Sequence, residues 1–245
     1  MTNPAFNSNT WARVYNIDRM DFFTVQGAVN KTAFLSILCL LVGGLTFKFS
    51  LYFRNTPIFF IGILAASLVA LVMVFITSFT PQISVVTGPL YAILEGFVLG
   101  GISALFEDEF AWIILQALGI TFAIIFITIL LYKMKLFEIT HRFILGVAVA
   151  TGAVALVYIV SFGLSFFGMD IPYIHSTGPV GIGFSVIVII IATLNLLVDF
   201  YNIEQGALLN APKYMEWYAA LGVLITVVWL YLEVLKLLAK VRSRR

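Results

Sequence analysis

The chain has 245 residues, of which 62% are hydrophobic and 11% are charged, and its mean hydropathy is +1.07. These values exclude a soluble globular domain and indicate a membrane protein with several spans. The net charge of +2 is too small to favour nucleic-acid binding. With one cysteine, Cys39, and two histidines, the sequence predicts neither a disulfide framework nor a Cys/His metal site.

Residues 1–28 mix charged and apolar side chains, and we interpret them as a cytoplasmic or interfacial segment before a membrane domain at 29–245. Seven apolar stretches follow, each near the ~20 residues that cross ~30 Å of hydrocarbon. They lie at about 32–53, 57–79, 88–106, 110–132, 143–167, 180–203 and 214–238. The runs are long and lack the alternation of a barrel strand, so the predicted fold is an all-α membrane protein of seven helices.

The short connections predict that consecutive helices are antiparallel neighbours, and an odd number of spans places the two termini on opposite sides. Seven of the 14 Lys and Arg residues then fall on each side, so the positive-inside rule does not decide the orientation. The acidic loop Glu107-Asp108-Glu109 contains no basic residue and favours a cytoplasmic amino terminus. The alternative is a cytoplasmic basic tail, if one apolar stretch is re-entrant. We expect the last span, with its small residues, to be more enclosed by protein than the first.

The sixth span carries a polar stripe. Asn195, Asp199 and Asn202 fall at positions i, i+4 and i+7, which is one face of a helix. A carboxylate at mid-membrane costs about 2.5–3.5 kcal/mol, so Asp199 is expected to face protein or a water-filled cavity. Burial favours the protonated form of a carboxyl group, which would make Asp199 responsive to pH. The alternative is a buried acid that only hydrogen-bonds a neighbouring helix.

The third span carries Glu95 next to a small-xxx-small pair, Gly96 and Gly100, which favours close helix packing. Glu95 has no basic residue within one turn. It is a candidate for a proton-responsive group that points into the bundle toward the sixth or seventh helix, and the alternative is a protonated residue that fixes packing.

The last span carries Glu216, Thr226 and Glu233. Glu216 follows Pro212 by one turn, where it would complement the helix dipole. Thr226 and Glu233 share a face, and Lys236 follows Glu233 at i+3, so an ion pair is the alternative to a functional role for Glu233. We find no signature of a nucleophile, a catalytic metal site or a phosphate-binding loop, and predict that the chain is not an enzyme and has no resident cofactor.

Several of these segments resemble the Bax inhibitor family, in its bacterial branch. The resemblance covers about residues 30–245. It is carried by Tyr91–Ser103 with Glu95, Gly96 and Gly100, by 117–126 with Lys133 and Lys135, by 197–204 with Asp199, and by the last helix with its basic end.

The resemblance implies a fold of two three-helix groups around a central, carboxy-terminal helix. It implies a pH-dependent leak of calcium, gated by two acids on the sixth and seventh helices that share a proton. Asp199 matches the first acid, whereas Thr226 stands at the place of the second. Glu95 or Glu233 would then supply the second carboxylate, and Asp199 and Glu95 are candidates for transient calcium binding.

Two hypotheses follow. The first is a pH-sensitive cation leak whose pathway includes Asp199, Glu95, Glu233, Asn195, Asn202 and Thr226, since hard cations prefer oxygen ligands. The second is a non-transporting regulator that binds partner membrane proteins through its small-residue helix faces. Both hypotheses place the chain in a lipid bilayer, and the resemblance indicates a bacterial inner membrane.

Overall fold

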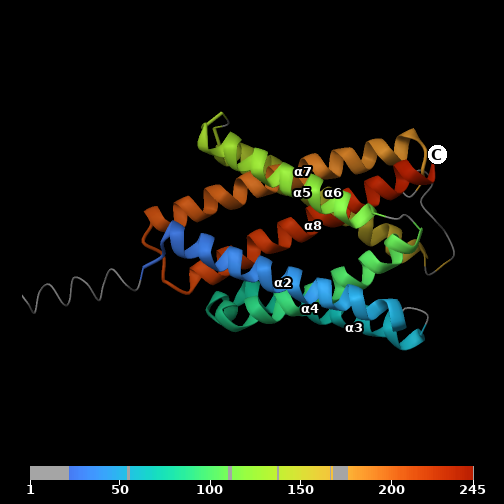
Figure 1. Cartoon of the computed structure of the whole chain (residues 1–245). Coiled ribbons are helices and arrows are strands. Elements are labelled where there is room, and N and C mark those ends of the chain that lie inside the picture. The colour runs from blue at the N-terminus through green and yellow to red at the C-terminus, as the bar shows by residue number, and fades with distance from the viewer. Residues whose placement is uncertain are drawn as a thin grey trace, which may run out of the picture.

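The computed structural model describes residues 22–53, 56–109, 112–136, 138–165, 167 and 176–244. Within these ranges seven helices are long and apolar enough to cross a membrane, which confirms the predicted all-α fold. They are α2 (Val25–Phe53), α3 (Pro57–Phe79), α4 (Ser84–Glu109), α5 (Ile113–Lys133), α6 (His141–Ser165), α7 (Pro179–Leu208) and α8 (Met215–Ser243). A short 3₁₀ helix, η2 (Pro81–Ile83), connects α3 to α4. The start of α2 and the carboxyl terminus lie at opposite ends of the bundle (Figure 1).

Prolines mark several helix starts. Pro57 and Pro179 occupy the first turns of α3 and α7. Backbone N–H groups there have no partner within the helix, so proline, which lacks this group, costs no hydrogen bond. The predicted bounds differ most at α2, which begins at Val25 rather than at residue 32. The predicted segment 1–28 therefore contributes its last residues to this helix, and its part up to residue 21 lies outside the described residues.

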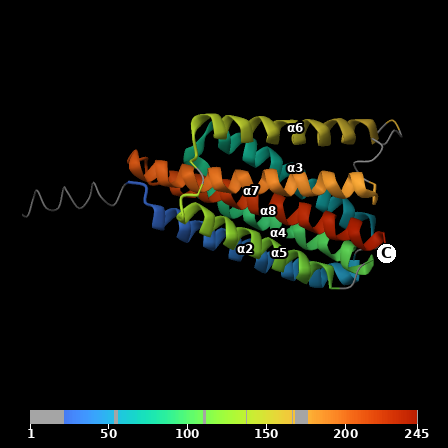
Figure 2. The same ribbon diagram turned by 90° about the horizontal axis from the view of Figure 1, so that it is seen from above.

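The last helix, α8, runs through the middle of the bundle in both views (Figure 1, Figure 2). In the apolar 18-residue stretch that defines each span, 56% of α8 is buried and 17% of α2. This difference confirms the prediction that the last span is more enclosed by protein than the first.

α8 packs against four helices, α2, α4, α5 and α7, whereas α3 packs mainly on α4 and α6 mainly on α7. In Figure 1, α2, α3 and α4 lie on one side of α8, and α5, α6 and α7 lie on the other. The predicted division into two groups of three helices is compatible with these pairings. Figure 2 shows that α6 stands at the outer edge of the bundle beside α7.

Gly96 and Gly100 on α4 allow a close approach to α2. A Cβ atom at Gly96 would lie 2.6 Å from the carbonyl oxygen of Cys39 and 2.9 Å from the Cβ atom of Val42. A Cβ atom at Gly100 would lie 2.8 Å from the Cβ atom of Thr46. These distances are too short for any side chain, so the small-xxx-small pair packs directly on the α2 backbone.

We expect Gly96→Ala to lower the free energy of unfolding by ~1–3 kcal/mol, because the α2 backbone at Cys39 has to move. Thermal unfolding of the detergent-solubilised protein, followed by tryptophan fluorescence, measures this loss. Gly44→Ala is the matched control on α2, since its new Cβ atom meets no atom within 4 Å. Equal losses in the two variants would contradict the proposed packing role of Gly96.

Candidate functional site

Asp199 on α7 faces α8. The hydroxyl of Thr226 donates a hydrogen bond to Asp199, with 2.6 Å between Oγ1 and Oδ2. The same hydroxyl lies 3.2 Å from the carbonyl oxygen of Gly222, one turn earlier on α8. Among the described residues, no basic side chain forms an ion pair with Asp199. Its carboxylate is therefore held by a neutral donor inside the bundle.

The polar stripe of α7 lies along its border with α6 and α8. Asn195 donates hydrogen bonds to Thr151 Oγ1 on α6 (2.6 Å) and to the carbonyl oxygen of Ile191 (2.9 Å). Asn202, at the other end of the stripe, is exposed. Of the three residues predicted to share a face, Asn195 thus contacts α6, Asp199 contacts α8, and Asn202 is exposed.

Glu233 occupies the next polar position on α8 and is almost completely buried. Tyr158 on α6 donates its hydroxyl to both carboxylate oxygens, at 2.9 and 3.0 Å. Lys236 forms an ion pair with Glu233 at 3.0 Å, and its ammonium group lies 4.8 Å from the centre of the Tyr158 ring. The ion pair that the sequence offered as an alternative is therefore present.

Thr226, Glu233 and Lys240 repeat every seven residues, which places them on one face of α8. Lys240 donates hydrogen bonds to Ser185 Oγ (2.9 Å) and to the carbonyl oxygen of Gly181 (3.1 Å), both on α7. Successive members of this face are ~10 Å apart along the helix. We use the term polar seam for the set Thr151, Tyr158, Ser185, Asn195, Asp199, Thr226, Glu233 and Lys240. It follows the contacts of α8 with α6 and α7 through most of the bundle.

Glu95 on α4 lies away from the polar seam. Its neighbours one turn away, Tyr91, Ala92 and Leu99, pack in an apolar cluster with Leu221, Leu224 and Val228 of α8. Those α8 residues lie ~140–160° around the helix from Thr226. By helical spacing Glu95 shares a face of α4 with these three residues, and its direction into the bundle stays a prediction. Among the described residues Asp199 is hydrogen-bonded to Thr226, on another face of α8, and no hydrogen bond joins it to Glu95.

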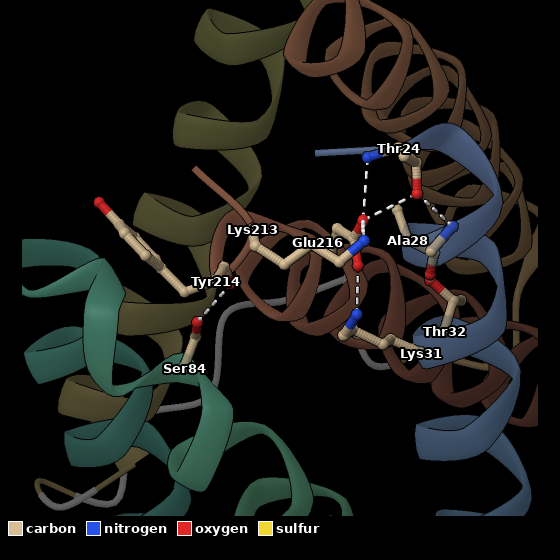
Figure 3. Close-up of polar contacts among 9 residues, drawn as sticks. Thr24, Ala28, Lys31, Thr32, Ser84, Lys213, Tyr214 and Glu216 are labelled. Atoms are coloured by element: carbon tan, nitrogen blue, oxygen red, sulfur yellow. Dashed lines mark hydrogen bonds and ion pairs between the residues drawn. The ribbon is translucent and has the colours of Figure 1, made fainter. Parts of the chain in front are cut away.

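Glu216 forms a second polar cluster, at the start of α8 (Figure 3). Its side chain is completely buried and pairs with Lys31 of α2 and, at 3.0 Å, with Lys213. One carboxylate oxygen also accepts hydrogen bonds from the backbone N–H (2.9 Å) and the hydroxyl (2.8 Å) of Thr24. Gly27 leaves room for this carboxylate, because a Cβ atom there would collide with it. We name this group, with Thr24, Lys31, Lys213 and Glu216, the Glu216 clamp.

Further contacts anchor the same end of α8. The backbone N–H of Phe23 donates to the carbonyl oxygen of Ala211 at 2.7 Å, and the Ser84 hydroxyl lies 3.3 Å from the carbonyl oxygen of Tyr214 (Figure 3). The segment before α2, the start of α4 and the α7–α8 turn are therefore joined at one end of the bundle.

Comparison with known proteins supports the resemblance found in the sequence. The family model described as Bax inhibitor 1 like matches residues 3–243. The chain belongs to this family. A comparison with curated proteins gives no match.

For this Bax inhibitor 1 like protein, the family expectation of an acid pair has to be compared with the side chains present. The described residues contain no group of three or more His, Cys, Asp or Glu side chains that could hold a metal ion. Asp199 has the Thr226 hydroxyl as its hydrogen-bond partner, whereas Asn195, one turn earlier on α7, bonds Thr151 of α6.

The sequence reasoning missed several seam and clamp residues. Thr151 and Tyr158 are seven residues apart in the middle of α6, and this spacing is a signal that could have identified them. Glu216 was predicted to complement the helix dipole, but its main partner, Lys31, lies 185 residues earlier. Nothing in the local sequence of either residue indicates that pairing.

We expect Glu216→Gln to lower the free energy of unfolding by about 3 kcal/mol, the low end of the ~3–5 kcal/mol for breaking a buried ion pair. The low end applies because Lys213 is 44% exposed and can turn toward water. Thermal unfolding in detergent measures the loss. Glu138→Gln, which neutralises an exposed carboxylate, is the control and should leave stability almost unchanged. A Glu216→Gln protein as stable as this control would show that the clamp contributes nothing.

Proposed function

We propose that this multi-pass membrane protein passes cations, calcium among them, in a pH-dependent way that Asp199 controls. The observation that carries the proposal is the position of Asp199 in the polar seam, bonded to Thr226 and without a basic partner among the described residues. A carboxylate inside a membrane bundle is costly, and such residues typically mark ion or proton pathways. Family membership supports the same function.

The Thr226 hydroxyl gives Asp199 two possible hydrogen-bond arrangements. A hydroxyl has one donor hydrogen and two acceptor lone pairs. When Asp199 is ionised it can only accept, so Thr226 donates to it across the 2.6 Å contact. When Asp199 is protonated, it donates to Thr226, whose hydrogen then turns to the carbonyl oxygen of Gly222, 3.2 Å away. Protonation thus reverses the direction of the contact between α7 and α8 without moving either helix.

The ionised state is the one that attracts a cation. Calcium takes oxygen ligands from carboxylates, amides and hydroxyls, and Asp199, Asn195 and Thr226 supply these three types. Exposed Asn202 marks the end of the stripe from which a cation would enter. We propose that loss of the Asp199 proton opens the path and that its return closes it.

The other predicted acids have lesser parts in this proposal. Glu233 is already neutralised by Lys236 and bonded to Tyr158, so it fixes α6 against α8. Glu95 has no hydrogen bond to Asp199 among the described residues and would act independently of it. The proposal therefore depends on one titrating carboxylate and not on a shared-proton pair. A bacterial inner membrane as the location also remains a proposal.

The test is calcium flux into liposomes that contain the purified protein, measured with a trapped fluorescent indicator at several pH values. Wild-type flux should rise with pH, because deprotonation of Asp199 supplies the negative charge. Asp199→Asn keeps the shape of the side chain but removes its charge, so flux should lose its pH dependence. Flux at high pH should fall roughly tenfold or more, because interactions with a charged group contribute ~1.5–3 kcal/mol.

Thr226→Val tests the hydrogen bond to Asp199 separately. This variant should shift the pH at which flux rises, but its flux should still depend on pH. Thr128→Val is the matched control: Thr128 is equally buried and bonds only the carbonyl oxygen of Ile124 on its own helix. Asp199→Asn with wild-type flux and pH response would contradict the gating role. Absence of flux in the wild-type protein would instead favour the non-transporting regulator.

A further inference from the structure

A long groove lies between α2 and α5. Both helices pack on α8, but they do not pack closely on each other. The space between them has a volume of about 1380 Å³ and is lined by α2, α4, α5, α7 and α8. Pockets for drug-sized ligands are ~300–1,000 Å³, so this groove is large enough for a lipid-sized molecule.

The groove opens toward the lipid side of the bundle. Along α2 its lining runs from Val25 to Phe47, which is ~33 Å of helix at 1.5 Å per residue. Val29 and Leu40 on its α2 edge are 48% and 47% exposed, and Phe122 on its α5 edge is 54% exposed. Its floor includes apolar side chains of α7 and α8, such as Leu196. An opening on this side of the bundle is in contact with the acyl chains of the surrounding bilayer.

Charged and polar groups gather at one end of the groove. Tyr132 and Lys133 end α5, Lys135 and Glu138 follow in the connection to α6, and Glu204 lies on α7. The Tyr132 hydroxyl donates a hydrogen bond to the Glu204 carboxylate. The ammonium groups of Lys133 and Lys135 form neither a hydrogen bond nor an ion pair with another described residue. Two cations without a partner among the described residues thus lie beside a long apolar channel.

We propose that this groove binds one phospholipid of the surrounding membrane, with an acyl chain between α2 and α5 and the phosphate at Lys133 and Lys135. The polarity of the groove, charged at one end and apolar along its length, matches that of a phospholipid. Lysine binds phosphate as a point charge. The site is separate from the polar seam, so it stands whether or not Asp199 gates ion flux.

The first experiment blocks the apolar part of the groove. Ala33 lines the groove two turns into α2, and Ala33→Phe places a ring where the acyl chain would lie. Ala148→Phe is the matched control, because Ala148 lies at a similar depth of α6, is exposed, and is not part of the groove lining. Native mass spectrometry of the purified proteins with added palmitoyl-oleoyl phosphatidylglycerol counts tightly bound lipids. Wild type and Ala148→Phe should retain one lipid that Ala33→Phe loses.

The second experiment tests the headgroup contact. A lysine near an anionic lipid headgroup contributes about fivefold in affinity, so Lys133→Gln with Lys135→Gln should weaken phosphatidylglycerol binding by roughly twentyfold. Binding of dioleoylglycerol, which has the chains but no phosphate, should not change. Both lysines are exposed, so this double variant should fold even if Ala33→Phe does not. Unchanged phosphatidylglycerol binding in the double variant would overturn the proposal, as would a lipid retained equally by Ala33→Phe and Ala148→Phe.

Discussion

The structure depends on one constraint: polar groups in hydrocarbon need partners inside the bundle. The central helix α8 supplies or receives most of these contacts. Thr226 bonds Asp199, Glu233 bonds Tyr158 and Lys236, and Lys240 bonds Ser185. Apolar positions on its other faces pack against α2, α4 and α5. The helix α8 therefore takes part in both the hydrophobic core and most of the polar contacts, and both sets of contacts enclose it in the bundle.

The number of spans, their approximate bounds and the enclosure of the last helix could be predicted from the sequence, because length and hydropathy determine which segments cross a membrane. The polar face of α7 could also be predicted, since helical spacing puts Asn195 and Asp199 together whatever packs against them. The close contact at Gly96 was indicated by its spacing from Gly100.

What could not be predicted is which helix each polar face meets. That depends on how helices far apart in the sequence pack, and periodicity within one helix carries no such information. The α4 neighbours of Glu95 pack with a face of α8 that lies away from Thr226, whereas Asp199 bonds Thr226 itself, so the expected pairing of the two acids does not follow from their helical faces. The full burial of Glu216 has the same origin: its partner Lys31 belongs to the first described helix and Glu216 to the last.

The Glu216 clamp also has a consequence for biosynthesis. Thr24 and Glu216 are 192 residues apart, so the beginning of α2 is fixed only after the start of α8 has been made. The helix that fills the centre of the bundle likewise leaves the ribosome after the other six described helices. Until α8 is inserted, the other six described helices lie in the bilayer without their central helix. In that state Lys31 lacks its carboxylate partner, Glu216. Insertion can follow the order of synthesis, but compaction of the bundle is deferred to its final step.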